Sequence, residues 1–420
     1  MSKKTLFMLA ALMTLPAAAY AQTSAETIKI YENTLAAQMT ITGNAIGLSY
    51  QATTGATSSS TKKYCIGTSD GIGAFMTLNP SAPPVPACSE GPAKNYPSGT
   101  TTDWGENGSM AYLDLPGGAE VVHAELIWAA SYKSTKGGTN STIDTLEDLS
   151  EFIAIPVTLS KLDGSDQGMT YVVPGRYFDE SGAAKTRNPS IADAATTTYE
   201  MHYYTNTADV TDFFRDSKTG AQLRGAGQYA VEGMPASADP RATVVNGGGW
   251  TLVVVYTHPD DSQTRNLTLF IQGENGTIVQ ENASVDYHVN GFCSPSAGPI
   301  TGKVFVSAME GDANDSAGYQ GDYLKVGTTD SNLQSLSGPN NHPDNFFASQ
   351  INTDNGRLDT RGTFGNRNHN YNPSTGKVTL TAGARQGWDI TSVPINTEYN
   401  TDYIEHHSES PWQLPQRCQT

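Results

Sequence analysis

The stretch Gly249-Trp250-Thr251-Leu252-Val253-Val254-Val255-Tyr256 decides the fold class. It is rich in β-branched and aromatic residues, which favour strands over helices. The run from Leu252 to Val255 has no polar face, and a strand of this kind is covered on both sides. We therefore expect a central strand. A polar turn begins at His258, and the alternating run Arg265–Phe270 predicts the return strand of a long β-hairpin.

Strand patterns continue on both sides of this stretch. Residues Glu26 to Tyr50 alternate loosely, and Val122, Ala124, Leu126 and Trp128 alternate with His123, Glu125 and Ile127. Period two predicts a half-buried strand in which His123 is an ordinary outward-facing residue. Val285–Phe292 and Val304–Ala308 predict further strands. The chain has 41 Gly and 20 Tyr and is only 16% charged, which is typical of short strands joined by many turns.

A few segments depart from the strand pattern. Thr142–Ile153 predicts a short helix, and Asp209–Phe214 predicts one or two helical turns with acids near the start. Tyr64–Trp104 is rich in Pro, Gly and Ser, and we expect a long excursion on the surface. The predicted fold is all-β, with one or two antiparallel β-sandwich or jelly-roll-like lobes, long loops and a few short helices.

The 420 residues divide into five predicted parts. These are a signal peptide (1–21), N-terminal strands with a disulfide-closed loop (22–109), a first sandwich lobe (110–275), a second lobe with an acidic loop (276–400) and a C-terminal tail (401–420).

The N-terminus has the three parts of a secretory signal. Lys3 and Lys4 precede the apolar run Thr5–Leu15, and Ala19-Tyr20-Ala21 is a small-x-small cleavage site, so we expect the mature chain to begin at Gln22. The alternative is a membrane anchor, but a span takes about 20 apolar residues and no run reaches that length. We expect a secreted protein, extracellular or at the cell surface, with the periplasm as the alternative.

The charge balance limits the classes of partner. The chain has 25 basic and 42 acidic side chains, a formal net charge of −17, and no basic cluster. Nucleic acids and anionic lipids are disfavoured as ligands, because both need a positive patch to displace counterions. The acidity keeps a secreted protein soluble, and it also suits divalent cations.

Four cysteines, Cys65, Cys88, Cys293 and Cys418, predict two disulfides, because the signal peptide directs them to an oxidising compartment. Three pairings are open. We favour Cys65–Cys88 with Cys293–Cys418, since the first pair brackets one loop-rich segment. A zinc site would need closely spaced cysteine pairs, and the sequence has none.

An acidic, Gly-rich loop follows the strand that ends at Ala308. It carries Glu310, Asp312, Asp315 and Asp322, and Asp389 is a further ligand candidate, with Asp344, Asn345 and Asp359 as more distant ones. Calcium takes six to eight oxygen ligands, which such a loop can supply. The loop is no EF-hand, because Ala317 and Tyr323 stand where Gly and the closing acid belong. The alternative is a solvated acidic turn. Calcium is the one cofactor that we expect.

Catalytic patterns are weak. Gly67-Thr68-Ser69-Asp70-Gly71 fits G-x-S-x-G, but it lacks the preceding strand and following helix that hold such a serine at an elbow. Carboxylate pairs for glycoside hydrolysis exist in any acidic chain, and only their separation across a cleft is informative. The sequence contains no H-E-x-x-H, P-loop or dinucleotide fingerprint.

Several segments together resemble a known family, the β-rich N-terminal module of uncharacterised, large secreted surface proteins of bacteria and archaea, many of which carry adhesin-like domains. They occur in the family's order between Met110 and Ile390: Ala111–Ala119 with Ala124–Trp128, Ala208–Asp212, Gly249–Tyr256 with Arg265–Phe270, Glu310–Asp322, and Asp344–Phe347 ahead of Trp388-Asp389. The resemblance implies a β-sandwich fold and an extracellular or cell-surface role without established enzymatic activity. This chain ends soon after Trp388-Asp389, without the family's appended repeats.

We therefore expect a non-catalytic protein that acts by binding or adhesion, stabilised by calcium, with a surface glycan or a protein as ligand. Two alternatives stay open. One is a secreted hydrolase of polysaccharide. The other is a subunit that assembles with copies of itself by β-strand addition, because sandwiches have edges that accept a strand.

Overall fold

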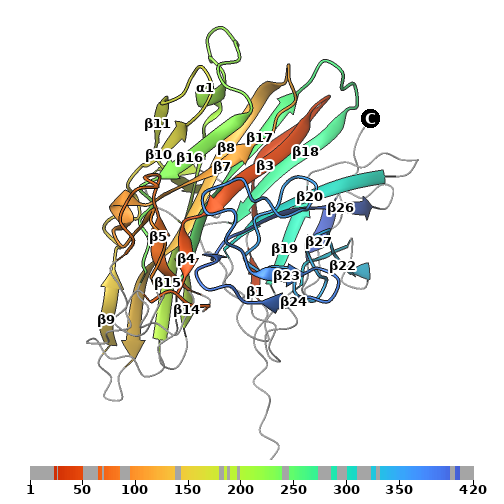
Figure 1. Ribbon diagram of the computed structural model, residues 1–420. Helices are drawn as coiled ribbons and strands as arrows, with labels where there is room; N and C mark the ends of the chain where they lie inside the picture. The colour runs from red at the N-terminus through yellow and green to blue at the C-terminus, as the bar shows by residue number, and fades with distance from the viewer. Residues whose placement is uncertain are drawn as a thin grey trace, which may run out of the picture.

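The computed structural model describes residues 23–25, 27–50, 65–68, 71–85, 95–137, 143–178, 184–186, 190–195, 199–238, 246–272, 285–290, 300–309, 323–327, 332–397 and 403–406. Within these ranges nearly all regular structure is antiparallel β-sheet, which confirms the predicted fold class (Figure 1). The regular exceptions among the described residues are the 3-10 turn η1 (Trp104–Glu106), the 3-10 residue Asn332 and the α-helical turn α1 (Thr211–Phe214). The last of these confirms the helical turn predicted after Asp209.

The largest sheet has the order β13-β12-β15-β8-β17-β3, with β14 paired to β15 and β9 paired to β8. We call it the central sheet. Its strands are β3 (Gln38–Ala45), β8 (Glu120–Gly137), β9 (Ile143–Asp148), β12 (Arg176–Phe178), β13 (Ala184–Thr186), β14 (Ser190–Ala195), β15 (Tyr199–Asp209) and β17 (Gly248–Thr257).

The remaining strands form smaller sheets. A four-stranded sheet, the outer sheet, has the order β11-β10-β16-β7 and contains β7 (Gly108–Leu113), β10 (Val157–Lys161), β11 (Thr170–Val173) and β16 (Gly227–Glu232). The others are β1 (Thr23–Ala25) with β19 (Val285–Asn290) and β27 (Tyr403–His406); β2 (Thr27–Leu35) with β18 (Arg265–Gln272); β20 (Ile300–Ala308) with β26 (Asp389–Thr397); β4 (Gly47–Ser49) with β5 (Ile72–Met76), β6 (Thr100–Thr101) and β25 (Arg385–Gln386); β21 (Lys325–Val326) with β22 (Gln334–Ser335); and β23 (Asn370–Asn372) with β24 (Lys377–Thr379).

Strand β17 contains the stretch that decides the fold, and its position confirms the prediction of a central strand. It lies between β8 and β3, and residues Gly248–Tyr256 are all buried. The predicted hairpin with Arg265–Phe270 is wrong. Both edges of β17 are already paired, so the chain crosses over after His258 and β18 pairs with β2 instead.

The core consists of layers on both faces of the central sheet. One face packs on the outer sheet and α1 through residues such as Trp128, Leu252 and Phe214. The other face packs against the β2–β18 and β20–β26 ribbons, with Val253 and Ile390 in a second apolar cluster. Figure 1 shows the outer sheet and the ribbons flanking β8, β17 and β3. This arrangement explains why β17 has no polar face.

Strand β8 is also covered on both faces, which overturns its predicted half-exposed pattern. Leu126 and Trp128 lie in the core under the outer sheet, whereas Ile127 packs against Ile28 and Ile271 of the β2–β18 ribbon. When both faces of a strand are covered, its alternating positions do not differ in burial, so a period-two pattern does not identify an exposed face.

Two further local predictions are wrong. Residues 143–148 of the predicted helix form β9, because pairing with the long strand β8 outweighs the local helical preference. The predicted surface excursion between Tyr64 and Trp104 contributes the buried strand β5, in which all five residues are inaccessible. The described portion of the Pro-rich part, residues 81–85, lies outside any strand.

Residues 338–369 contain no named strand, and amide side chains add to the isolated bridges and turn hydrogen bonds that hold the backbone there. Asn341 Nδ2 donates to the Phe346 carbonyl at 2.9 Å, and Asn345 Nδ2 donates to the Gly376 carbonyl at 2.7 Å. Both side chains are buried. This Asn-rich region therefore contains a buried polar network, in which the Asn341 and Asn345 amides satisfy backbone carbonyls and the Asn352 amide bonds other side chains.

Strand pairing joins segments that are distant in sequence. β3 pairs with β17, and β4 pairs with β25 near the other end of the chain. The predicted boundaries at 109/110 and 275/276 stay predictions.

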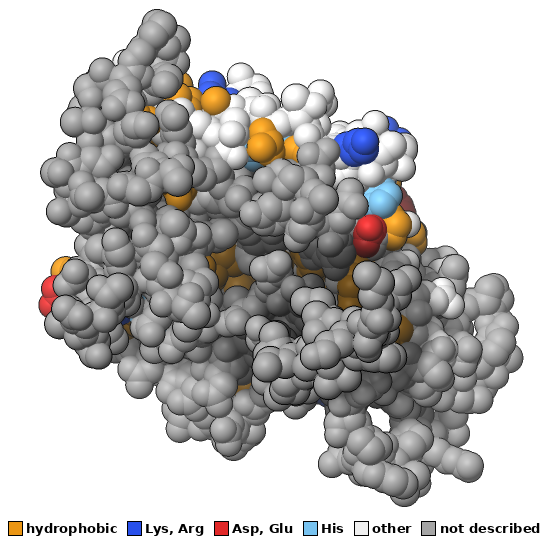
Figure 2. Space-filling view, turned by 90° about the horizontal axis from the view of Figure 1, so that it is seen from below, with side chains coloured by type: hydrophobic (Ala, Val, Ile, Leu, Met, Phe, Trp, Pro, Cys, Tyr) orange, Lys and Arg blue, Asp and Glu red, His pale blue; other side chains and the backbone are white. Residues whose placement is uncertain are grey.

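Within the described ranges, no helix has the length and apolar character needed to cross a bilayer. In the view from below, described basic, acidic and hydrophobic side chains show as small separate groups (Figure 2).

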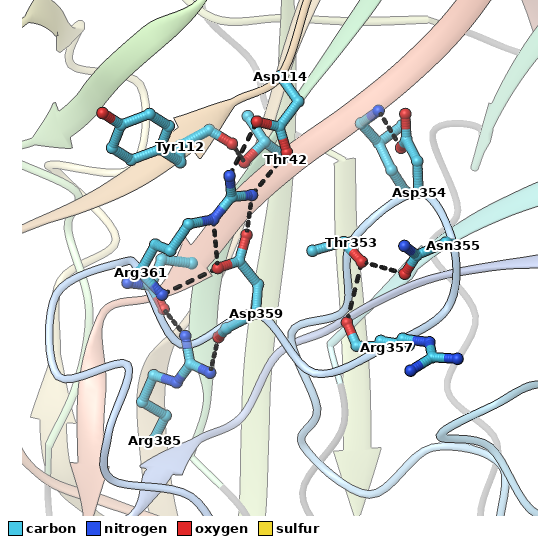
Figure 3. Close-up of polar contacts among 12 residues, drawn as sticks. Thr42, Tyr112, Asp114, Thr353, Asp354, Asn355, Arg357, Asp359, Arg361 and Arg385 are labelled. Atoms are coloured by element: carbon cyan, nitrogen blue, oxygen red, sulfur yellow. Dashed lines mark hydrogen bonds and ion pairs between the residues drawn. The ribbon is translucent and has the colours of Figure 1, made fainter.

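An arginine clamp ties residues 359–361 to β7. Arg361 donates to both carboxylate oxygens of Asp359 at 2.7 and 3.0 Å and to both oxygens of Asp114 at 2.7 and 2.8 Å (Figure 3). Its guanidinium lies 5.0 Å from the centre of the Tyr112 ring. The buried Arg385 donates to the Asp359 carbonyl at 2.7 Å. Bidentate pairs of this kind are the stronger class of charged hydrogen bond.

Asp359 should therefore make stability depend on pH. Its burial alone would raise the pKa of its carboxyl, but hydrogen bonds from the Arg361 side chain and backbone outweigh that effect and lower the pKa. A carboxyl with a lowered folded-state pKa stabilises the fold above its unfolded pKa, near 4, and that contribution is lost as pH falls through the folded value. We expect Asp359→Asn to lose about 2 kcal/mol of unfolding free energy at pH 7, with the difference shrinking below about pH 4.

Urea unfolding across this pH range measures the effect. The control is Asp344→Asn, because Asp344 is exposed and no ion pair of its side chain occurs in the described structure. A constant difference between wild type and Asp359→Asn down to pH 2 would show that the clamp does not contribute in this way.

Candidate functional site

A shallow groove of about 580 Å³ opens where β2, β8 and α1 meet the end of β15. Its lining combines an aromatic ring, an imidazole, an amide, a hydroxyl and two carboxylates. The lining residues are Tyr31, Asn33, Val122, His123, Asp209, Thr211 and Asp212. We call this the Tyr31–His123 groove.

Two β-bulges shape the groove. On β8, His123 pairs with Val255 and Val121 pairs with Tyr256, so Val122 is the extra residue. On β2, the partners of Leu269 and Phe270 are Tyr31 and Lys29, so Ile30 is the extra residue. A bulge bends its strand and re-aims the neighbouring side chains. Both bulges lie directly beside the residues whose rings form the floor of the groove.

The bulge on β8 also corrects the predicted strand faces. The sequence pattern placed Val122 on one face with Ala124, but Val121 occupies the core with Ala124 and Val122 lines the groove. An extra residue shifts the alternation of the two faces by one position, and a period-two pattern in the sequence does not reveal that shift.

His123 is the centre of the groove, and its predicted role as an outward-facing residue is wrong. Only 8% of the residue is exposed, because Tyr31 stacks on the imidazole with ring centroids 4.4 Å apart and 12° between planes. Its Nδ1 lies 3.5 Å from Thr211 Oγ1 and 3.9 Å from Asp209 Oδ2. Its Nε2 lies 3.5 Å from Glu125 Oε2.

Glu125 lies beneath His123 and is fully buried. Its two carboxylate oxygens accept from Arg176 Nη2 at 2.8 and 2.9 Å, and it also accepts from the Thr207 hydroxyl. Arg176 thus compensates the charge of Glu125, as a buried carboxylate requires. Glu125 supports the imidazole from below and does not line the groove.

The rim residues are held by the backbone. Asp209 Oδ1 accepts from the Thr211 amide at 2.9 Å, and Thr211 Oγ1 accepts from the Ala124 amide at 2.9 Å. Asp212 projects from α1 and is exposed. Burial raises the pKa of the Tyr31 hydroxyl, against a smaller lowering effect of the Asn33 side chain. The groove therefore offers fixed donors and acceptors around an aromatic ring.

The order Thr211–His123–Glu125 resembles a nucleophile, a base and an orienting carboxylate. A working relay needs contacts of about 2.6–3.2 Å, although such contacts are often looser without substrate. Both contacts here are 3.5 Å, and Arg176 already compensates Glu125. The arrangement suits binding better than nucleophilic catalysis.

Most of the predicted calcium ligands lie outside the described residues, namely Glu310, Asp312, Asp315 and Asp322. Asp389 is described and buried, and its carboxylate accepts from the backbone amides of Ala348, Ser349 and Gln350 at 3.3, 3.0 and 2.8 Å. Among the described residues, no three His, Cys, Asp or Glu side chains are grouped as a metal site. Calcium binding by the acidic loop stays a prediction.

The other predicted sites are only partly described. Cys65 is buried, whereas Cys88, Cys293 and Cys418 lie outside the described ranges, so the disulfide pairing stays a prediction. Ser69 of the G-x-S-x-G pattern is also outside them. Asp359 belongs to the arginine clamp, and Asn345 belongs to the buried amide network.

Sequence reasoning treated His123 and Asp209–Asp212 only as parts of structural elements and missed Tyr31 and Asn33. The available signal was His123 directly after two valines in a strand, which indicates no function by itself. Comparison of the chain with protein-family models, with curated proteins and with solved structures finds no match to any of them.

Proposed function

We propose that this protein is secreted and acts outside the cell by binding, without catalysis, as an adhesin-like or structural surface protein. The observation that carries the proposal is the Tyr31–His123 groove, and we propose that its ligand is a carbohydrate of a cell surface or matrix. Sugars combine hydroxyl groups, which need donors and acceptors, with apolar ring faces, which pack on aromatic side chains. The groove offers both kinds of contact.

The scaffold supports this role because it holds the groove residues in place. Tyr31 and His123 stack on each other, and the strands that carry them are covered by apolar layers. Side chains held in one conformation lose little entropy when a ligand binds. A preformed polar groove on a rigid sheet is typical of sites that bind a ligand.

Substitution of Tyr31 tests the groove. Tyr31→Ala removes the aromatic wall, and we expect affinity for a glycan identified on an array to fall about tenfold, corresponding to roughly 1.4 kcal/mol. Isothermal titration calorimetry measures the affinity. Tyr323→Ala is the matched control, because Tyr323 is a half-buried aromatic residue like Tyr31 and lies outside the groove.

Equal affinities of Tyr31→Ala and the control would place the binding surface elsewhere. If wild type binds no glycan on a broad array, carbohydrate recognition is refuted. Circular dichroism and thermal melting confirm that both variants fold.

The extracellular setting is supported by the N-terminal signal pattern, the four cysteines and the acidic composition. We expect the chain expressed with its own N-terminus to be exported and cut before Gln22, with two disulfides. Intact mass of the exported protein checks the cleavage, and non-reducing peptide mapping distinguishes the three pairings, of which Cys65–Cys88 with Cys293–Cys418 is expected. Retention of the uncut chain in the cytoplasm would contradict the proposal.

One observation favours a second function, self-assembly by strand addition. β11 lies at an end of the outer sheet, and no described strand pairs with its other edge. Lys161 N donates to Met169 O at 2.9 Å, so alternation directs the backbone groups of Thr170 and Val172 toward the open edge. Val172 is 64% exposed. The strand carries no charge, so a second copy of β11 can pair with it antiparallel despite the acidity of both chains.

Sedimentation over a range of concentrations tests this assembly. We expect wild type to self-associate weakly and Val172→Lys to stay monomeric, because lysine on an edge strand opposes pairing. Ser335→Lys adds the same charge at an exposed position of β22 and should behave like wild type. A wild-type protein that is monomeric at every concentration would exclude assembly through β11.

A further inference from the structure

The exposed large apolar side chains of the described residues gather at one corner of the molecule. They are Met169, Tyr171, Val172 and Leu223. Met169 lies in the turn before β11, and Tyr171 and Val172 belong to β11. Leu223 lies beside α1, where its amide donates to the Phe214 carbonyl at 2.7 Å. Figure 1 shows β11 and α1 at the same end of the molecule. Apolar side chains grouped on a protein surface indicate an interaction site.

The same corner has an open strand edge. The backbone groups of Thr170 and Val172 point away from β10, and no described strand pairs with them. No residue from Gly168 to Gly175 is charged. The corner therefore suits an uncharged β-strand as its partner, and β11 of a second copy is such a strand. The net charge of −17 makes copies repel each other at acidic surfaces, so an uncharged corner is where two copies can approach.

The residues at the two ends of β11 limit how it can pair with its own copy. In an antiparallel pair, residues whose backbone groups point outward must oppose each other. A register with Val172 opposite itself places Thr170 opposite Pro174, which has no N–H to donate. A register with Thr170 opposite itself places Val172 opposite Gly168, whose amide already donates to the Lys161 carbonyl at 2.8 Å. Both registers therefore lose hydrogen bonds.

The remaining symmetric register uses every outward backbone group of β11. Thr170 opposes Val172 of the second copy, and Val172 opposes its Thr170. Each of these pairs exchanges both of its N–H···O bonds. Tyr171 then lies at the twofold axis and faces Tyr171 of the second copy.

From these observations we infer that two copies join through β11 in this register and form a closed symmetric dimer. The inference rests on the proposed self-assembly and specifies its register and its end point. The two outer sheets become one continuous sheet. Tyr171 stacks on Phe213 of its own chain at a centroid distance of 5.8 Å, so the two Tyr171 rings at the axis extend an aromatic row across both copies. Both copies use the same edge, so the interface closes on itself and no third copy can add to it.

Distances between Cα atoms distinguish this register from the others. The two Tyr171 Cα atoms lie about 4.5 Å apart, because they form a non-hydrogen-bonded pair. The two Thr170 Cα atoms are offset by two residues along the strands and lie roughly 9 Å apart, and the same holds for the two Val172 Cα atoms. A disulfide needs Cα atoms within about 7 Å of each other.

Disulfide trapping with the intact mature protein tests the register. We expect Tyr171→Cys to form linked dimers under mild oxidation, and Thr170→Cys and Val172→Cys alone to form at least about tenfold fewer. An equimolar mixture of Thr170→Cys and Val172→Cys should link, because these positions oppose each other. Non-reducing electrophoresis measures the yield, and wild type controls for linkage through the native cysteines. Preferential linkage of Thr170→Cys alone or of Val172→Cys alone would show another register and overturn the inference.

Sedimentation separates this inference from the proposed self-assembly. We expect wild type to approach a dimer, and no larger species, as its concentration rises. Species that keep growing with concentration overturn the closed dimer and leave self-assembly intact. Dimers that none of the cysteine variants links place the contact elsewhere and also overturn the inference alone. If wild type is monomeric at every concentration, the proposed self-assembly itself fails.

Discussion

Strand β17 is buried on both faces, and this constraint organises the molecule. A strand without a polar face needs an apolar layer on each side, and adjacent residues of β17 reach one layer each. Trp250 donates from Nε1 to Ser109 on β7 at 2.9 Å, whereas Thr251 accepts from Trp388 Nε1 on the opposite side at 3.1 Å. The approach is so close that a Cβ atom on Gly249 would lie 2.3 Å from the Trp388 ring. The outer sheet and the β20–β26 ribbon are therefore both fixed in position relative to β17.

The same constraint places the groove. Because β8 pairs with β17 along most of its length, the bulge at Val122 cannot relax by sliding the strands without removing Trp128 from its place opposite Trp250. Register is strongly specified where both faces are buried. The extra residue is accommodated locally, and His123 faces the β2–β18 ribbon under Tyr31. A rigid core thus holds a polar site at its border.

The sequence could predict the class of fold but not the choice of partners. The apolar run from Leu252 to Val255 predicts burial on both faces, and this was confirmed, because burial depends on the local pattern. The hairpin prediction failed because pairing depends on which edges are free, and both edges of β17 are occupied by strands distant in sequence. The prediction of a helix at 142–153 failed for a related reason, since pairing with β8 is a tertiary effect.

The groove could not be predicted for two reasons. A bulge displaces Val122 by one position, and a period-two pattern gives no signal of it. Tyr31 also lies far from His123 in the chain.

The pairing of β4 with β25 bears on the order in which the molecule can fold. Ser49 Oγ accepts from the amide of Ala384, 335 residues further along the chain. Joining two such distant segments closes a very long loop. Topologies dominated by contacts between distant segments fold slowly, because the chain loses the entropy of loop closure before the stabilising contacts have formed. The N-terminal strands thus have an unpaired edge until nearly the whole chain is present. A chain that emerges from its N-terminus onward would need protection of that edge, by the timing of its synthesis or by a chaperone, before the native sheet can form.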